Sequence, residues 1–449
     1  MMGLSKKLAG YMTSLAYDEL PDEVVQFAKL CILDYFGSAI AGRDKAPIQM
    51  IAAFSEEMGG NEQATAVTGG KTSVMNAALV NGAASHMVEL DDIHKGSIIH
   101  AATVVIPAAM AIAEWKRRSG KDVIAAVVAG YEVCYRIGEA VSPSHYYYWH
   151  NTATCGTFGA AAAAAKLLNA TEEQTVHALG HAGTQAAGLW EFIVDGAMTK
   201  QLHPGKAAMN GVISALLAVK NFTGAKKILE GNRGFFRAMS EQFDASKVTE
   251  QLGKEHKIVE NSFKIYASCR HTHPVMDEMI ELAKTRYFRQ SDIDHIVVQT
   301  YQAALDITDN DEPKTVYEAK FSLQFCTALA LLRGKGGLDD FNEETLWDHD
   351  IRALMKRVKL MVDRSMDAAY PNKWGASIAV HLINGETLAG KTDFPKGDPE
   401  KPVAPDELID KFHRLAKHMP DAAREQLANG ILALEQLPNV QGLLNALHQ

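Results

Sequence analysis

The hydrophobic pattern of this chain is helical over more than half of its length, which limits the folds it can adopt. From residue 1 to about 260, apolar residues recur every three or four positions, as Val24, Phe27 and Cys31 do. Small residues crowd several of these segments, including six consecutive alanines at 160–165. A phosphate-binding loop would need more glycines and a Lys-Ser/Thr ending, so we interpret the small residues as sites of close helix packing.

The pattern changes after about residue 265, where helical and strand-like segments begin to alternate. Asn384-Gly385 stands between two alternating apolar runs and predicts a β-hairpin. A Pro-rich stretch at 394–405 follows, and helical patterns then resume. We therefore expect a mainly α protein, with a large all-helical domain and a smaller inserted α+β domain. The expected boundaries are 1–265 for the first part of the helical domain, 266–402 for the α+β domain and 403–449 for the C-terminal helices that rejoin the first part.

Composition places the chain among ordinary soluble proteins, with 449 residues, 47% of them hydrophobic and 22% charged. The formal net charge of −9 and the lack of a basic run argue against nucleic-acid binding. Five scattered cysteines without a CxxC pair favour a reducing cytosol and oppose a thiolate zinc site. The start shows no signal-peptide pattern, and polar residues interrupt the longest uncharged run, at 140–165. We expect a cytoplasmic protein without a membrane span.

The segment 86–100 concentrates titratable groups between two apolar helical patterns. Its fifteen residues include three histidines and three carboxylates. Burying such groups is costly unless they are hydrogen-bonded, bound to metal or turned toward a cleft. Histidines that merely cap helix ends would give a similar pattern, but so many titratable groups in one place favour a functional site. The candidates here are His86, Glu89, Asp91, Asp92, His94 and His100.

Two cationic clusters precede predicted helices. The first cluster stands at the start of a small-residue helix predicted from residue 205 and contains Lys200 and Lys206. The second stands before a helix predicted from residue 274 and contains Lys264, Arg270 and His273. Free N–H groups and the helix dipole add to such positive charge, and the planar fork of an arginine suits a carboxylate. Solvated charged turns would explain both clusters equally well.

A fourth candidate is His150, which ends an aromatic stretch at 146–149. Taken alone, such a histidine is more often a structural residue. Together with the basic clusters of an acidic chain, however, it suits a small anionic substrate, most simply a di- or tricarboxylate. Histidines and carboxylates beside such an anion favour proton abstraction next to a carboxylate.

Several short segments stand in one order along nearly the whole chain: Asn81-Gly-Ala-Ala-Ser-His86, Leu90-Asp-Asp92, His100, Gly130-Tyr-Glu-Val133, His150-Asn-Thr152, Lys200-Gln-Leu-His-Pro-Gly-Lys-Ala-Ala208, Cys269-Arg-His-Thr-His-Pro274, Glu318-Ala-Lys-Phe-Ser322 and Phe394-Pro-Lys-Gly-Asp398. In this order they resemble the motifs of the MmgE/PrpD family. The resemblance implies a large helical domain with an inserted α+β domain, usually as a homodimer. It also implies cofactor-free chemistry on polycarboxylates: 2-methylcitrate dehydration, cis-aconitate decarboxylation or iminodisuccinate epimerisation.

The resemblance also assigns roles by motif position. It implies catalytic roles for Asp91, His100, His150, Lys200 and Lys264. Substrate contacts are expected from Glu89, Asp92, Lys206, Cys269, Arg270 and His273.

The chain departs from decarboxylase-like members at four places near these motifs. It has Glu89 where they carry Asp, Ile93 where they carry Thr, and Cys269 where they carry His. Ala101 and Ala102 follow His100 in place of the common Pro-Ser. Loss of the hydroxyl at position 93 should reshape substrate contacts, so these departures leave the particular substrate open.

The leading hypothesis is a lyase without cofactor or metal that acts on a small di- or tricarboxylic acid, with cleavage of a carbon–oxygen bond favoured and epimerisation as the alternative. A second hypothesis is a metal-dependent hydrolase that uses His86, Asp91, His94 and His100 as ligands. A third, a non-enzymatic helical scaffold, does not explain cationic groups in apolar surroundings.

Overall fold

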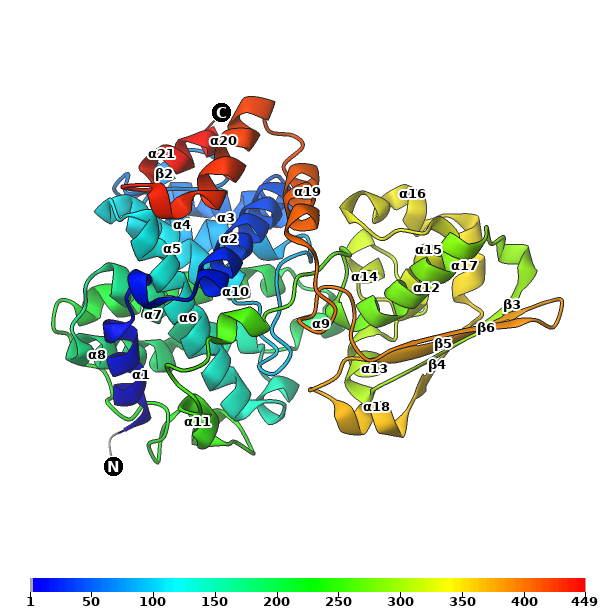
Figure 1. Ribbon diagram of the computed structural model, residues 1–449, viewed down its shortest axis with the longest axis horizontal. Helices are drawn as coiled ribbons and strands as arrows, with labels where there is room; N and C mark the ends of the chain where they lie inside the picture. The colour runs from blue at the N-terminus through cyan, green and yellow to red at the C-terminus, as the bar shows by residue number, and fades with distance from the viewer. Residues whose placement is uncertain (1–2, 449) are drawn as a thin grey trace. The chain divides into compact units, whose positions relative to one another are not determined.

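The computed structural model describes residues 3–448, with residue 195 described by its backbone alone, and it divides into two compact units (Figure 1). Unit 1 contains the residues up to 87, 91–261 and those from 404 onward, and unit 2 contains 88–90 and 262–403. The expected boundaries were 265/266 and 402/403. The sequence did not foresee that the short segment 88–90 groups with unit 2.

Unit 1 is built almost wholly of helices. Its α-helices are α1 (Leu4–Ser14), α2 (Asp22–Gly42), α3 (Ala46–Met58), α4 (Val74–His86), α5 (Ala102–Lys116), α6 (Gly120–Val141), α7 (Asn151–Leu167), α8 (Glu172–Gln185), α9 (Phe192–Asp195), α10 (Thr199–Ala218), α11 (Phe235–Met239), α19 (Pro405–Leu415), α20 (Asp421–Leu432) and α21 (Gln441–Leu444). A short antiparallel pair, β1 (Ala64–Thr65) and β2 (Lys71–Thr72), corrects the expectation that this part is all-helical.

Close glycine contacts bring the core helices of unit 1 together. A Cβ on Gly205 of α10 would lie 2.3 Å from the carbonyl oxygen of Leu79 of α4, and one on Gly82 would lie 3.0 Å from the Cα of Gly205. On α6 and α7, a Cβ on Gly159 would lie 2.7 Å from the carbonyl oxygen of Gly130. The small residues therefore serve close helix packing, as the sequence indicated, and α4, α5, α7 and α10 pack against one another.

Several helices begin earlier than the sequence indicated. The small-residue pattern predicts a helix from residue 156, whereas α7 starts at Asn151, and α10 starts at Thr199 rather than at 205. Pro204 lies inside α10, where a proline normally breaks a helix, and this misplaced the predicted start. The lysines of 199–206 are therefore part of the helix instead of preceding it, which corrects our interpretation of this cluster.

Thr171 and Gln174 have the spacing of a capping box in the sequence, and in the structure they form one that opens α8. Near the C-terminus, the pattern of residues 430–447 predicts a single helix, and this prediction is wrong, because α20 continues to Leu432 and only the short α21 and 3-10 turns follow.

Among residues 3–448, α2 alone is long and apolar enough to cross a membrane by length and composition, but 78% of its most apolar window is buried inside the structure. Two charged residues of α2 are tied to the C-terminal helices. The Nζ of Lys29 donates to the carbonyl oxygen of Leu432 at 2.8 Å, and Asp34 pairs with Lys411 at 2.5 Å. These contacts are those of a core helix that the C-terminal segment completes.

Unit 2 contains a four-stranded sheet in the order β4-β3-β5-β6, formed by β3 (Ile293–Thr300), β4 (Val358–Val362), β5 (Ala376–Leu382) and β6 (Thr387–Thr392). The hairpin β5–β6 turns at Asn384-Gly385, as predicted, with Gly385 at φ 89°. The mixture of helix and strand patterns after residue 265 predicts antiparallel strands, but β3 pairs with β4 in parallel, which corrects that prediction. The helices α12 and α15 pack together beside this sheet (Figure 1).

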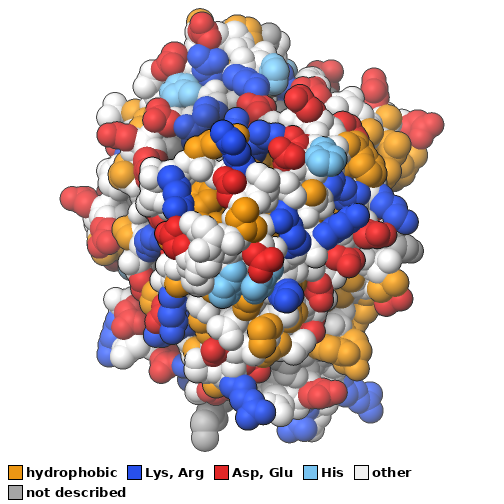
Figure 2. All heavy atoms as spheres, turned by 90° about the vertical axis from the view of Figure 1, so that its right-hand side faces the viewer, with side chains coloured by type: hydrophobic (Ala, Val, Ile, Leu, Met, Phe, Trp, Pro, Cys, Tyr) orange, Lys and Arg blue, Asp and Glu red, His pale blue; other side chains and the backbone are white. Residues whose placement is uncertain are grey.

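The helices of unit 2 are α12 (His273–Thr285), α13 (Gln302–Thr308), α14 (Val316–Ala319), α15 (Leu323–Arg333), α16 (Glu343–Leu346), α17 (His349–Met355) and α18 (Arg364–Ala369). Figure 2 shows one face of the molecule, on which basic and acidic side chains are intermixed. A surface of mixed sign creates only a local field.

Candidate active site

The ends of four helices of unit 1 carry the candidate groups. α4 ends at His86, α5 starts just after His100, α7 starts just after His150, and the first turns of α10 carry Lys200 and His203. Because these four helices pack against one another, residues from four distant parts of the chain are brought together. The ring centroid of His86 lies 4.9 Å from that of His100 and 5.7 Å from that of His150.

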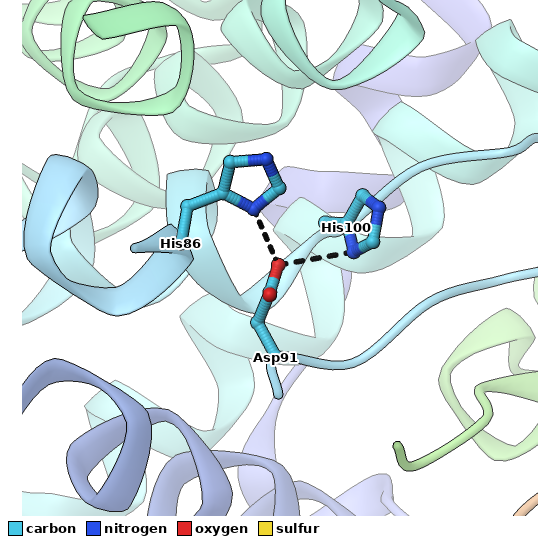
Figure 3. A group of neighbouring side chains, drawn as sticks. All are labelled: His86, Asp91 and His100. Carbon is cyan, nitrogen blue, oxygen red and sulfur yellow. Dashed lines mark hydrogen bonds and ion pairs between the residues drawn. The ribbon is translucent and has the colours of Figure 1, made fainter. Parts of the chain in front are cut away.

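One oxygen of Asp91 lies between two histidines (Figure 3). Its Oδ2 is 2.7 Å from Nδ1 of His86 and 3.0 Å from Nδ1 of His100. The same nitrogen of His100 is 2.6 Å from the carbonyl oxygen of Asp92. Because these partners are acceptors, each ring carries its proton on Nδ1, and each neutral ring keeps a lone pair on Nε2.

The two histidines differ in exposure. His86 is fully buried, and its Nε2 has no hydrogen-bond partner among the residues that the structure describes. The side chain of His100 is 12% exposed, so it is the more accessible of the two. A carboxylate that orients such a ring and stabilises its protonated form is typical of acid–base catalysis.

Asp92 is directed into the protein. Its Oδ1 accepts from the backbone N–H of Ala102 at 3.0 Å, and its Oδ2 accepts from the Tyr131 hydroxyl at 2.7 Å and from the Asn261 amide at 2.8 Å. Burial raises the pKa of Asp92 to about 7, although these hydrogen bonds oppose the shift. The substrate contact expected of Asp92 has no support in these bonds, which instead fix the loop to the start of α5.

His94 stabilises the far end of the same loop. Its ring stacks on Tyr135 at 4.2 Å, its Nδ1 lies 2.9 Å from the Ser97 hydroxyl, and its Nε2 lies 3.3 Å from Glu260. The second hypothesis made His94 a metal ligand together with residues 86, 91 and 100. The structure gives His94 a separate set of partners, so this four-ligand arrangement is not formed.

A smaller metal site is geometrically possible, because the donor atoms of His86, Asp91 and His100 all lie within 4.8 Å of one another. In the structure, however, the Nδ1 atoms of His86 and His100 both lie within hydrogen-bond distance of Oδ2 of Asp91. A metal ion would have to replace both hydrogen bonds. The donor set therefore fits proton transfer better than metal binding.

His150 forms a pair with His203. Their Nδ1 atoms are 3.2 Å apart, and the rings of Trp190 and Phe192 pack against the pair. Burial lowers the pKa of His150 well below its usual value, and the nearby positive charges of His203 and Lys200 add to the effect. Burial likewise lowers the pKa of His203 to about 4. Both rings are thus neutral near pH 7.

The two lysines of α10 differ in their surroundings. Lys200 is 3% exposed and stands three residues before His203 on α10, and its charge contributes to the lowered pKa of both His150 and His203. Lys206 donates from Nζ to the carbonyl oxygen of Ala187 at 3.0 Å, and burial lowers its pKa. The substrate contact expected of Lys206 has no support in this hydrogen bond.

In unit 2, two lysines hold the segment 88–90. The Nζ of Lys264 lies 3.3 Å from Oε2 of Glu89, and both side chains are buried. The Nζ of Lys320 donates to the carbonyl oxygen of Val88 at 2.9 Å. Glu89 has a positive φ of 60°, which is uncommon outside glycine. Lys264 and Glu89 were both expected at the active site, and the structure joins these two side chains as a buried ion pair.

Arg270 is engaged inside unit 2. Its guanidinium pairs with Asp398, lies 2.9 Å from Nδ1 of His273 and donates to the carbonyl oxygen of Lys396 at 3.1 Å. Cys269 is buried, and its backbone N–H donates to the carbonyl oxygen of Lys320 at 2.9 Å. The substrate contacts expected of Cys269, Arg270 and His273 have no support in these internal contacts.

The sequence did not assign a role to His203 or to Asn261. His203 follows Lys200 by three positions, and this spacing puts both on one face of a helix. That signal was present, but the predicted helix began after them. Nothing in the sequence indicated that Tyr131 and Asn261 would meet Asp92.

Residues 6–247 match the MmgE/PrpD N-terminal domain, and residues 266–435 match the MmgE/PrpD C-terminal domain. The chain belongs to the MmgE/PrpD family. This MmgE/PrpD enzyme is 29% identical to a cis-aconitate decarboxylase of Aspergillus terreus, over 99% of this chain and 96% of the relative. A mouse cis-aconitate decarboxylase is 26% identical over 98% of this chain and 92% of its own length. A mitochondrial 2-methylcitrate dehydratase of Yarrowia lipolytica is 24% identical over 71% of this chain and 65% of its own length.

Proposed function

We propose that this enzyme is a cofactor-independent lyase that acts on a small di- or tricarboxylic acid through proton transfer at a carbon next to a carboxylate. The observation that carries the proposal is the carboxylate oxygen of Asp91, which lies 2.7 Å from His86 and 3.0 Å from His100. It supplies an oriented imidazole with a basic Nε2, which proton abstraction requires.

An anionic substrate is favoured by the surroundings of these histidines. Lys200 is a buried cation in the first turn of α10, three residues before His203, and His100 and His150 stand just before the N-terminal ends of α5 and α7. The N-terminal ends of helices attract negative charge, and a buried ammonium stabilises a carboxylate or an enediolate more strongly than an exposed one does.

In the proposed reaction, His100 takes the proton from the substrate carbon, and Asp91 stabilises the imidazolium that forms. In a dehydration, the carbon–oxygen bond then breaks and an acid donates a proton to the leaving hydroxyl. In a decarboxylation no carbon-bound proton is removed first: the carbon–carbon bond to one carboxylate breaks, carbon dioxide leaves, the bonding electron pair stays on the remaining carbon framework, and an acid protonates that carbanion. We assign this proton transfer to His150, whose ring centroid lies 6.5 Å from that of His100.

The sequence favoured carbon–oxygen cleavage, and the relatives support decarboxylation equally, because the decarboxylases match nearly the whole chain. Epimerisation of a dicarboxylate such as iminodisuccinate is a second candidate. It needs two proton-transfer groups on opposite faces of one carbon, and the separate settings of His100 and His150 suit that requirement.

One experiment separates these outcomes. The enzyme is incubated in deuterium oxide with cis-aconitate, 2-methylcitrate or iminodisuccinate, and proton NMR follows each compound. A dehydratase forms a new alkene, a decarboxylase forms a product with one carboxylate fewer, and an epimerase exchanges a proton without losing a group. Asp91→Asn serves as the control and should be nearly inactive. A wild-type enzyme that neither converts nor exchanges any di- or tricarboxylate would refute the proposal.

The homodimer and the cytoplasmic location expected from the sequence remain predictions. Sedimentation at micromolar concentration tests the first, and a monomer would contradict it.

A further inference from the structure

We propose that His203 is a positioning residue that fixes the tautomer of His150, so that His150 presents an N–H donor at Nε2. The catalytic consequence rests on the proposed function, whereas the tautomer is a property of the protein without substrate. His203 would act only through His150.

The geometry requires the two rings to have opposite roles. Their Nδ1 atoms lie 3.2 Å apart, with ring centroids separated by 5.4 Å and planes inclined by 39°. One Nδ1 must therefore carry the proton and the other must accept it. If both rings are neutral, the ring that accepts at Nδ1 carries its own proton on Nε2, and the ring that donates from Nδ1 has no proton on Nε2.

The surrounding chain is built to hold this pair. The carbonyl oxygen of Gly188 accepts from the backbone N–H of His150 at 2.9 Å. A Cβ at Gly188 would lie 3.3 Å from Nδ1 of His203 and 2.4 Å from the Cβ of Ala153. The ring of Phe192 packs edge-on against His203 at 5.4 Å. Gly188 thus fixes the backbone of His150 and leaves room for the ring of His203.

The charges around the pair keep both rings neutral. Besides burial, the positive charge of Lys200 lowers the pKa of both histidines, and the charge of Lys206 adds to the effect at His203. A neutral pair joined by one hydrogen bond has two possible arrangements, because the proton can sit on either Nδ1.

The neighbouring histidines favour one of these arrangements. His86 and His100 both turn Nδ1 toward the Asp91 carboxylate, so that each presents a lone pair at Nε2. Lyase chemistry on a carboxylic acid also needs a donor for the leaving group or for the developing enediolate. If His203 donates from Nδ1, His150 supplies that donor, and a neutral imidazole can fill this role.

The tautomer can be measured without substrate. The protein is labelled with ¹⁵N-histidine, and correlations between ring nitrogens and ring protons report which nitrogen carries hydrogen. His150→Gln identifies the His150 signals. We expect hydrogen on Nε2 of His150 in the wild type. Hydrogen on Nδ1 of His150 in the wild type would overturn the proposal.

Substitutions at position 203 test the cause. His203→Phe keeps a ring against Phe192 but cannot donate, so His150 should lose its fixed tautomer. His203→Asp offers only an acceptor, so His150 should switch to Nδ1–H. His181→Phe is the matched control, because His181 is another buried histidine, bonded to the carbonyl oxygen of Phe222, and its loss should leave the His150 signals unchanged. A His150 tautomer that is the same in all four proteins would show that His203 does not set it.

Kinetics then link the tautomer to turnover on whichever polycarboxylate the NMR panel identifies. We expect His203→Asp to lose on the order of 10²–10⁴ in kcat, with KM changed much less, as for an acid–base group held in the wrong tautomer. Equal turnover of wild type and His203→Asp, with the tautomer switched, would remove His203 from the mechanism. If the tautomer follows position 203 and no polycarboxylate is converted, the proposed function fails while the positioning role stands.

Discussion

Gly82 of α4 and Gly205 of α10 touch backbone to backbone, so that a Cβ on Gly82 would lie 3.0 Å from the Cα of Gly205. This contact sets the separation of the two helices. Because α4 ends at His86 and α10 carries Lys200 and His203 in its first turns, it also helps to set the spacing between these side chains. The glycine motifs of this family thus have a structural reason in this chain.

We predict that Gly205→Ala destabilises the protein. Its Cβ would lie 2.3 Å from the carbonyl oxygen of Leu79, which belongs to the backbone and cannot rotate away. Replacing a helical glycine by alanine normally stabilises by about 0.4–1 kcal/mol, whereas overpacking of this kind costs roughly 1–3 kcal/mol. Denaturant unfolding measures the difference. The control is Gly442→Ala, since nothing lies within 4 Å of a Cβ there, and it should be neutral or slightly stabilising.

We predict that Asp91 and His100 act as one unit in catalysis. His100→Ala should lose on the order of 10²–10⁴ in kcat, the usual range for a general acid–base group, and should stop exchange of the substrate proton with deuterated solvent. Asp91→Asn should cost a similar factor, because the Nδ1 of His100 lies 3.0 Å from the carboxylate oxygen that orients it. The double variant should be little worse than either single one. Fully multiplicative losses would mean that the two residues act independently.

We predict that Lys200→Ala raises KM strongly. It removes a charged hydrogen bond to a substrate carboxylate, which is worth roughly 1.5–3 kcal/mol. The control is Lys226→Ala, since Lys226 is an exposed lysine paired with exposed Glu173 and should not affect KM. An unchanged KM in the Lys200 variant would assign Lys200 to structure alone.

The fold could be predicted from the sequence to a large extent, because helical periodicity and turn residues act locally. The hairpin at Asn384-Gly385 follows from neighbouring residues. The parallel pairing of β3 with β4 could not be predicted, because it joins strands that are far apart in sequence.

The candidate site could be predicted only in part. The polar segment 86–100 indicated a cluster of titratable groups, and the structure brings His86, Asp91 and His100 of this segment together. The partners of each group depend on helix packing that no local pattern encodes. For this reason Asp91 and Asp92 looked equivalent in sequence, whereas one faces two histidines and the other faces Tyr131. Pro204 concealed His203, because a proline usually marks the end of a helix.

We predict that the ion pair of Lys264 and Glu89 contributes to stability separately from any catalytic role. Lys264→Met leaves the buried Glu89 carboxylate without its ammonium partner and should cost roughly 3–5 kcal/mol. Adding Glu89→Gln should recover most of that loss, because it removes the uncompensated charge. Lys284→Met is the control, because Lys284 belongs to an exposed pair with Glu281 and should change stability little.

Activity of the same double variant tests the role that the sequence implied for Lys264. We expect a folded protein with very low turnover, because the ammonium itself would be needed by the substrate. If turnover returned together with stability, Lys264 would have a purely structural role.

The last prediction concerns the pH dependence of stability, and it follows from Asp92. Burial raises its pKa to about 7 in the folded protein, from an ordinary value of 3.8. A carboxyl group with a raised folded-state pKa stabilises the protein fully at pH below 3.8, and this contribution is lost as pH rises through about 7. Over that window the loss amounts to at most about 4 kcal/mol, since one pKa unit corresponds to roughly 1.4 kcal/mol.

Asp92→Asn isolates this effect, because an amide has nearly the shape of a protonated carboxyl group and does not titrate. Subtracting the unfolding free energy of wild type from that of the variant at each pH cancels the titration of all other groups. We expect the variant to be the less stable at pH 5, because its amide N–H₂ would face the N–H₂ group of Asn261, which now donates to Asp92 at 2.8 Å. As pH rises to 8, the unfolding free energy of the variant should increase relative to that of the wild type, since only the wild type must then bury a charged carboxylate. Denaturant unfolding at pH 5, 6, 7 and 8 measures it, and a difference that stays constant would show that Asp92 is already ionised in the folded protein at pH 5.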